Sequence, residues 1–139
     1  MTRKTYFVVW TAVALALVGC DGWYFRRIDV TGPETAGFAL DSASTQAVLL
    51  ALRDYATQAK LRCTSVDALP FECSRTPVRV WAQQSQHGVA VCYSAHGASF
   101  EQKKFQRRID HLQRLLVERL GARSVTSSQA NCPAMAATP

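Results

Sequence analysis

Residues 99–121, SFEQKKFQRRIDHLQRLLVERLG, decide the fold class because they carry the clearest helical pattern of the chain. Apolar side chains recur there every three or four residues, which places them on one face of a helix. Ser99 and Gln102 have the spacing of a capping box, and Gly121 is well placed to end the helix. The apolar stripe consists of Phe105, Ile109, Leu112, Leu116 and Leu120.

A second amphipathic helix is predicted from about residue 42 to about residue 61. Its apolar positions have spacings of four, three and four, and Asp41 or Ser42 is the expected N-cap. These positions are Val48, Leu52, Tyr55 and Ala59.

Four short segments have the composition or alternation of strands. They are residues 24–30, 78–82, 89–94 and 123–126. The pair His87-Gly88 predicts a hairpin between the two middle strands, whereas the segment between the first helix and residue 78 is predicted to be a loop.

The predicted element order is strand, helix, strand, strand, helix, strand. This order indicates the α+β class, as a two-layer sandwich with both helices on one face of a small antiparallel sheet. The order is similar to that of ferredoxin-like folds.

The N-terminus has the three parts of an export signal. Arg3 and Lys4 precede an uncharged run from residue 6 to residue 18, and small Gly19 precedes Cys20. The sequence Leu17-Val18-Gly19-Cys20 resembles the lipobox of bacterial lipoproteins. The resemblance implies that the chain is cut before Cys20 and that the Cys20 thiol carries diacylglycerol, which anchors the protein to a membrane.

Two other interpretations of this segment stay open. One is an ordinary cleaved signal with a coincidental cysteine, and the other is an uncleaved anchor with Trp10 and Trp23 at the membrane interface, which Asp21 disfavours. Asp21 directly after the cysteine also resembles an inner-membrane retention signal. We therefore expect a periplasm-facing protein, at the inner rather than the outer membrane.

The chain is then expected to have four parts. These are a signal peptide (1–19), a lipidated N-terminus and short tether (20–23), an α+β domain (24–126) and an irregular tail (127–139). Removal of Arg3 and Lys4 lowers the formal charge from +6 to +4. This charge is modest, and without a nucleic-acid-binding motif we expect no nucleic-acid partner.

Four further cysteines suit two disulfides in an exported domain. Three connectivities are open, of which Cys63–Cys73 with Cys92–Cys132 is favoured. The first pair brackets a short loop that contains proline, and the second would hold the C-terminal tail. Since no Cys-x-x-Cys or spaced His pair is present, we expect no metal and no cofactor.

No catalytic residue is expected. His96 could act as a base near Ser94 or Ser99, but no acidic residue is placed by the sequence to orient it. His87 is expected to be a solvated loop residue, and His111 a half-exposed residue on the flank of its helix.

Two groups of residues are candidates for partner binding. Lys103, Lys104, Arg107 and Arg108 crowd the start of the last helix, where cations oppose the helix dipole. They form either a docking face for anionic headgroups or an acidic partner, or a solvated face. Arg79 and Trp81 are expected on the outer face of the sheet, either as interface anchors or covered by the tail.

These features favour a non-enzymatic protein-binding module in the bacterial envelope. It would be an accessory of an envelope assembly, or an immunity or inhibitor protein. The alternative is a hydrolase that acts on cell-wall or lipid material.

Overall fold

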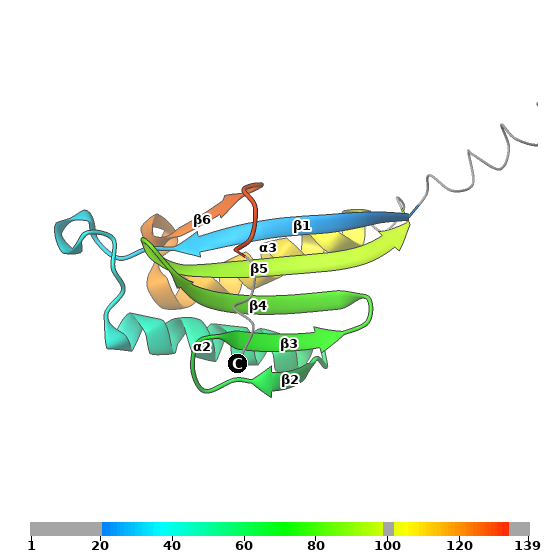
Figure 1. The fold of residues 1–139 in the computed structure, drawn as a ribbon, viewed down its shortest axis with the longest axis horizontal. Helices are drawn as coiled ribbons and strands as arrows, with labels where there is room; N and C mark the ends of the chain where they lie inside the picture. Colours follow the sequence, from blue (N-terminus) through cyan, green and yellow to red (C-terminus); the bar gives the residue numbers. More distant parts are fainter. Residues whose placement is uncertain (1–20, 99–101, 134–139) are drawn as a thin grey trace, which may run out of the picture.

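A six-stranded antiparallel sheet with the order β2-β3-β4-β5-β1-β6 organises the chain (Figure 1). The computed structural model describes residues 21–98 and 102–133. The strands are β1 (Asp21–Val30), β2 (Arg62–Ser65), β3 (Phe71–Arg75), β4 (Val78–Ser85), β5 (Gly88–Ala98) and β6 (Val125–Ser128). The helices are α2 (Ser42–Gln58) and α3 (Gln102–Leu120), with short 3-10 turns at Glu34–Ala36 and Ala122–Ser124.

Strands β1 and β5 pair over their whole length in the middle of the sheet. The alternation of β1 places Ile28 and Val30 in the core, both fully buried, whereas Arg27 and Asp29 lie on the other face and pair at 2.8 Å. Pairing begins at Asp21, which lies opposite Ala98. The short tether expected at residues 20–23 is therefore wrong for residues 21–23, which belong to β1.

Helix α2 begins where the sequence predicted. The side chain of Asp41 accepts a hydrogen bond from the backbone N–H of Ser44 at 2.6 Å, as an N-cap does. The helix ends at Gln58, slightly before the predicted residue 61. Lys60 has a positive φ of 55° there, and the N–H of Leu61 turns back to the carbonyl of Ala56.

Helix α3 ends at Leu120, and Gly121 follows with a φ of 88°, which suits glycine. The N–H of Gly121 donates to the carbonyl of Val117. The predicted capping residue Ser99 lies outside the described residues.

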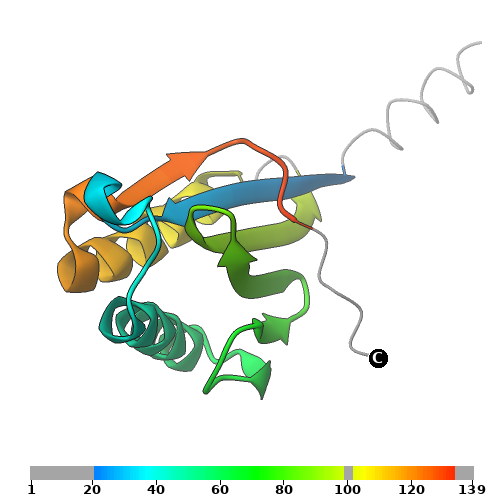
Figure 2. The same cartoon turned by 60° about the vertical axis from the view of Figure 1, so that its left-hand side comes forward.

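The apolar faces of both helices and one face of the sheet form the core. In Figures 1 and 2 both helices lie behind the sheet as it is seen in Figure 1. Fully buried side chains from the helices meet those from the central strands; they include Leu52, Ile109, Leu112, Leu116, Ile28, Val80, Val91 and Tyr93. The antiparallel sheet with two helices confirms the α+β class.

The loop predicted between α2 and residue 78 is wrong, because this segment forms strands β2 and β3. Cys63 lies directly opposite Cys73, and Phe71 and Cys73 are fully buried while their neighbours are more exposed. This alternation is typical of an antiparallel strand that packs one face on the core. The predicted tail also begins too early, since β6 continues to Ser128. Residues 134–139 of that tail lie outside the described residues.

Candidate functional site

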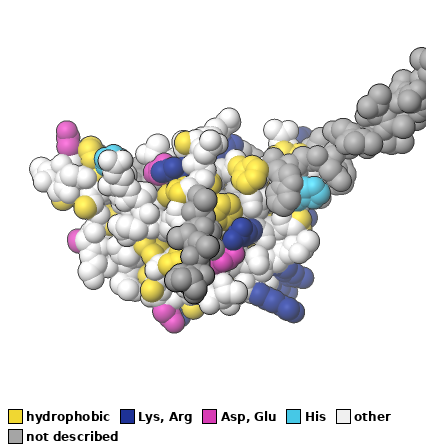
Figure 3. Space-filling model, in the orientation of Figure 1, with side chains coloured by type: hydrophobic (Ala, Val, Ile, Leu, Met, Phe, Trp, Pro, Cys, Tyr) yellow, Lys and Arg dark blue, Asp and Glu magenta, His cyan; other side chains and the backbone are white. Residues whose placement is uncertain are grey.

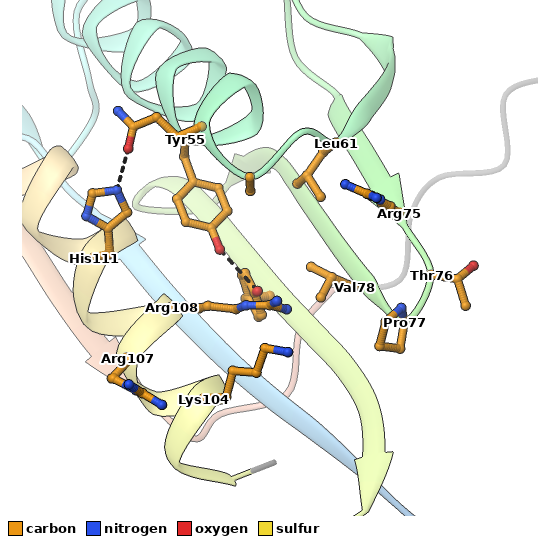
Figure 4. A pocket seen from close by; sticks show the side chains of 13 residues that line it. Tyr55, Leu61, Arg75, Thr76, Pro77, Val78, Lys104, Arg107, Arg108 and His111 are labelled. Atoms are coloured by element: carbon orange, nitrogen blue, oxygen red, sulfur yellow. Dashed lines mark hydrogen bonds between the residues drawn. The ribbon is translucent and has the colours of Figure 1, made fainter.

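A groove of about 770 Å³ lies between the end of α2, the first half of α3 and the turn that joins β3 to β4 (Figure 4). Its basic side chains come from two elements that are far apart in the sequence. Arg75 is at the end of β3, and the others are on α3: Lys104, Arg107, Arg108 and His111. No described Asp or Glu lines this groove.

Two tyrosines from α2 and β5 also line the groove. The hydroxyl of Tyr55 donates a hydrogen bond to the hydroxyl of Tyr93 at 3.1 Å, and the rings meet edge to face. Tyr93 is fully buried and Tyr55 is 2% exposed. Burial raises the pKa of Tyr55 far above its usual range; the bond to Tyr93 raises this pKa further, and the charge of Arg108 partly offsets the rise. Tyr55 is therefore a neutral hydroxyl at physiological pH.

One rim of the groove is held by a contact between the two helices. The ring nitrogen Nε2 of His111 lies 2.6 Å from Oε1 of Gln58, the last residue of α2. The His111 ring also lies 5.9 Å from the ring of Tyr55. His111 is half-exposed, as predicted, and it also lines the groove.

The structure divides the predicted basic cluster. Lys104 and Arg108 extend from α3 toward the tyrosine pair, and Arg75 points to the same space from β3 (Figure 4). Arg107 lies at the rim and donates to the carbonyl of Lys103 at 3.4 Å, whereas Lys103 itself does not line the groove.

Sequence reasoning missed three residues of this site. Arg75 belongs to a segment that was predicted to be a loop, so nothing placed it near α3. Tyr55 was predicted as a core position of its helix, and Tyr93 as part of a strand. Two buried hydroxyls that face each other are a tertiary feature, and no spacing in the sequence signals it.

The other candidate residues, Arg79 and Trp81, lie on the opposite face of the sheet. Trp81 is only 7% exposed, and its ring is stacked under the guanidinium of Arg79 at 5.1 Å. Arg79 also pairs with Glu72 at 2.7 Å. Residues 129–133 line a cavity of about 690 Å³ together with Trp81, Arg79 and Phe25. Of the two interpretations of Trp81, coverage by the tail is the one that the structure supports.

The cysteine pairs are those favoured from the sequence. One disulfide joins Cys63 of β2 to Cys73 of β3, and the other joins Cys92 of β5 to Cys132 of the tail. Both lie on the sheet, so they brace its edge and its C-terminal segment. Cys20 lies outside the described residues.

The candidate acid–base residues do not converge in the described part of the chain. Ser94 is 4% exposed within β5, and His96 lines a small adjoining cavity, on the other side of the Thr76–Val78 turn that also lines the groove. His87 lies at the β4–β5 turn, where its ring contacts Phe38 edge-on. Ser99 lies outside the described residues.

Within residues 21–98 and 102–133, no group of three or more His, Cys, Asp or Glu side chains is arranged to hold a metal ion. None of the helices in this range is both long and apolar enough to cross a bilayer.

Comparison with protein-family models, curated proteins and solved structures finds no match to this chain. The function of the groove therefore has to be inferred from the side chains that line it. It gathers positive charges and hydroxyl groups on two walls, which suits the binding of an anionic group.

Proposed function

We propose that this chain is a lipid-anchored lipoprotein of the bacterial envelope and acts as a non-enzymatic protein-binding module. The lipobox-like sequence at residues 17–20 supports the anchor, and the two disulfides suit an exported domain. Asp21 after Cys20 favours the inner membrane, with the domain in the periplasm.

The observation that carries the non-enzymatic part of the proposal is the composition of the groove. It combines Arg75, Lys104, Arg107 and Arg108 with the two buried tyrosine hydroxyls, and no described carboxylate faces them. General acid–base catalysis needs groups that exchange protons near neutral pH. Arginine and lysine remain charged there, and Nε2 of His111, the histidine that lines the groove, is engaged with Oε1 of Gln58 at 2.6 Å. This set of side chains is suited to holding an anion in place.

The rival function is an envelope hydrolase. It would require a nucleophile or water held between an acid and a base. Several described carboxylates are instead paired with arginines, as in Asp29 with Arg27 and Glu72 with Arg79. His96 lies outside the groove. These positions favour binding over hydrolysis.

The fold supports a compact module of this kind. Strands β4-β5-β1-β6 are neighbours in that order, and α2 and α3 follow β1 and β5 in the chain. We infer a ferredoxin-like unit in which the hairpin β2–β3 is inserted after α2 and extends one edge of the sheet. The inserted hairpin leads into the turn that forms one wall of the groove.

Two forms of the function differ in the partner. An assembly accessory would bind a component of a multiprotein envelope machine, and an immunity or inhibitor protein would bind a toxin or a lytic enzyme. The identity of the bound protein separates the two forms.

The test is in-cell crosslinking of the lipidated full chain, followed by purification and mass spectrometry. We expect one dominant partner protein in roughly stoichiometric amount. In cells that carry the Cys20→Ser variant, we expect the crosslinked complex to be lost from the membrane fraction. Recovery of only scattered envelope proteins would contradict the protein-binding function. In that case His96→Ala and single carboxylate variants would be assayed on cell-wall and lipid substrates.

A further inference from the structure

We propose that the groove binds the phosphate of an anionic phospholipid headgroup in the membrane that holds Cys20. The inference rests on the lipid anchor of the proposed function and names the ligand of the groove. Three independent observations carry it: the position of the groove, its charge, and a buried hydroxyl hydrogen without an acceptor.

The first observation is that the groove lies at the anchored end of the sheet. Tyr24 lies opposite Ala95, which lies opposite Val78 of the groove. The N–H of His96, opposite Trp23, donates to the carbonyl of Pro77, also in the groove. With a rise of about 3.3 Å per residue, Tyr24 lies only about 10 Å along the strand from Asp21, the residue that follows Cys20 in the sequence.

Helix α3 reaches the same end of the molecule. Its first-turn residue Phe105 packs on the ring of Tyr24 at 5.3 Å, and Gln106 accepts a hydrogen bond from Arg26. The neighbouring positions Lys104 and Arg108 therefore lie close to the start of β1. In Figure 3 Lys and Arg side chains protrude at the right-hand end of the molecule, which is the end where β1 begins in Figure 1.

The domain has almost no chain with which to move away from this membrane. Strand pairing begins at Asp21, the residue after Cys20. Acyl chains on Cys20 would hold the sheet end at the headgroups, which occupy about 5–8 Å of each leaflet. The groove then opens where phosphates are abundant.

The second observation is charge without internal neutralisation. Arg75, Arg107 and Arg108 make no ion pair with a described acidic residue, unlike Arg27, Arg53, Arg79 and Arg119. Anionic lipid surfaces attract basic side chains that lie near them. Cations at the start of α3 also oppose the helix dipole, so helix stability does not explain their position.

The third observation is a spare donor at the tyrosine pair. Tyr55 and Tyr93 carry two hydroxyl hydrogens but share one hydrogen bond. The second hydrogen has no acceptor among the described residues, although both side chains are at least 98% buried. A buried donor without an acceptor is costly. A phosphate oxygen in the groove would accept this hydrogen beside the guanidinium of Arg108.

This attachment would fix the orientation of the domain. Lipid at Cys20 and a headgroup in the groove are two contacts at one end of the sheet. The opposite end, with Phe38 and His87, then faces the periplasm, where the partner protein can reach it.

The experiment uses the full mature chain with Cys20→Ser, so that lipid binding does not depend on the anchor. Its sedimentation is measured with vesicles of phosphatidylcholine alone and with phosphatidylglycerol added. We expect binding only to the anionic vesicles. Arg75→Gln with Arg108→Gln should weaken it by about tenfold or more. The control, Arg53→Gln with Arg123→Gln, removes the same charge outside the groove and should bind as the parent does.

The double variant Tyr55→Phe and Tyr93→Phe tests whether the tyrosine hydroxyls take part in binding, without a change of charge. We expect several-fold weaker binding, with circular dichroism showing a retained fold. Equal weakening by both arginine pairs, or unchanged binding of the tyrosine variant, would overturn the proposal in favour of general electrostatic attraction.

Two further measurements test whether the groove binds a different anion, namely free phosphate or an acidic group of a partner protein. Inorganic phosphate that binds with the same tyrosine dependence, while vesicles do not bind, would assign the site to free phosphate. Groove variants that lose the crosslinked protein but keep vesicle binding would assign it to an acidic partner. Either result overturns the headgroup proposal, and neither bears on the anchor itself.

Discussion

Trp81 lies directly opposite Cys92 in the pairing of β4 with β5, and the disulfide of Cys92 leads to Cys132 in the tail. The C-terminal segment is thereby drawn across the outer face of the sheet beside the indole ring. The guanidinium of Arg27 donates to the carbonyl of Asn131 at 3.0 Å and holds the same segment. The disulfide and this hydrogen bond together keep the C-terminal segment beside the indole ring.

Replacement of Cys92 and Cys132 by Ala should release the tail and expose Trp81. We expect a loss of about 2–4 kcal/mol in the free energy of unfolding, because the cross-link restricts the unfolded chain. The fluorescence of Trp81 should shift to longer wavelength. A Trp81→Phe variant assigns the signal, since Trp23 is the other tryptophan after Cys20.

The second disulfide provides the matched control. Removal of Cys63 and Cys73 opens a loop with a sequence separation of 10 rather than 40, so it should cost about 1 kcal/mol less. It should leave the emission of Trp81 unchanged. An equal spectral shift in both double variants would show that the tail does not cover the indole ring.

Gly88→Ala should destabilise the domain strongly. Gly88 has a φ of 121°, which side chains rarely adopt, and an added Cβ would overlap the carbonyl oxygen of Val30. We expect a loss of more than about 2 kcal/mol in thermal or denaturant unfolding. Gly37→Ala is the control, because φ is also positive there but nothing lies within 4 Å of the added Cβ. Its cost should be about 1 kcal/mol, and similar costs for both would contradict the close approach at Val30.

The sequence predicted what depends on local pattern. The apolar stripe of α3 and the alternation around Ile28 reflect the burial of one face of an element, and this burial repeats regularly along the sequence. The N-cap at Asp41 is a signal carried by a single residue type at the start of a helix. The hairpin β2–β3 was missed because β2 has no alternation of buried apolar residues: Arg62 and Thr64 are exposed, and Ser65 is polar and only half-buried. Strand β2 is defined by its pairing with β3, which in turn pairs with β4.

The candidate site was predicted only in part, for a related reason. Lys104, Arg107 and Arg108 are near one another in the sequence, so their clustering was visible. Arg75 and Tyr93 reach the groove only through the sheet order. Trp81 was correctly placed on the outer face, but its coverage depends on a disulfide whose connectivity the sequence left open.

Asp41→Asn should change the pH dependence of stability while retaining the helix cap. The backbone N–H of Ser44 lowers the pKa of Asp41 below its ordinary value of 3.8, so the folded state favours the carboxylate. The stability that this group contributes is present above pH 3.8 and is lost as the pH falls below it. Asn caps nearly as well as Asp. The variant should therefore lose less stability on acidification than the parent, as measured by denaturant unfolding at several pH values. A parallel decline in both proteins would contradict this role of Asp41.

Tyr55→Phe should reduce the sensitivity of the fold to alkali. Burial raises the pKa of Tyr55 above its ordinary value of 10.0, so the folded state holds the proton more tightly than the unfolded state. Its contribution is complete below pH 10.0 and declines above it, by up to about 1.4 kcal/mol per pH unit. The variant should show a shallower decline, after a loss of about 1 kcal/mol at neutral pH for the bond to Tyr93. A Tyr55→Phe slope equal to the parental one would refute the assignment.

The most direct test of the account is the mass of the N-terminal peptide of the protein isolated from membranes. The account predicts a mature chain that begins at Cys20 and carries diacylglycerol on its thiol, and a Cys20→Ser protein that leaves the membrane fraction. A chain that retains residues 1–19, or an unmodified Cys20 in a protein that is still bound to membranes, would contradict the lipid anchor. It would also remove the basis on which the groove is assigned to a lipid headgroup.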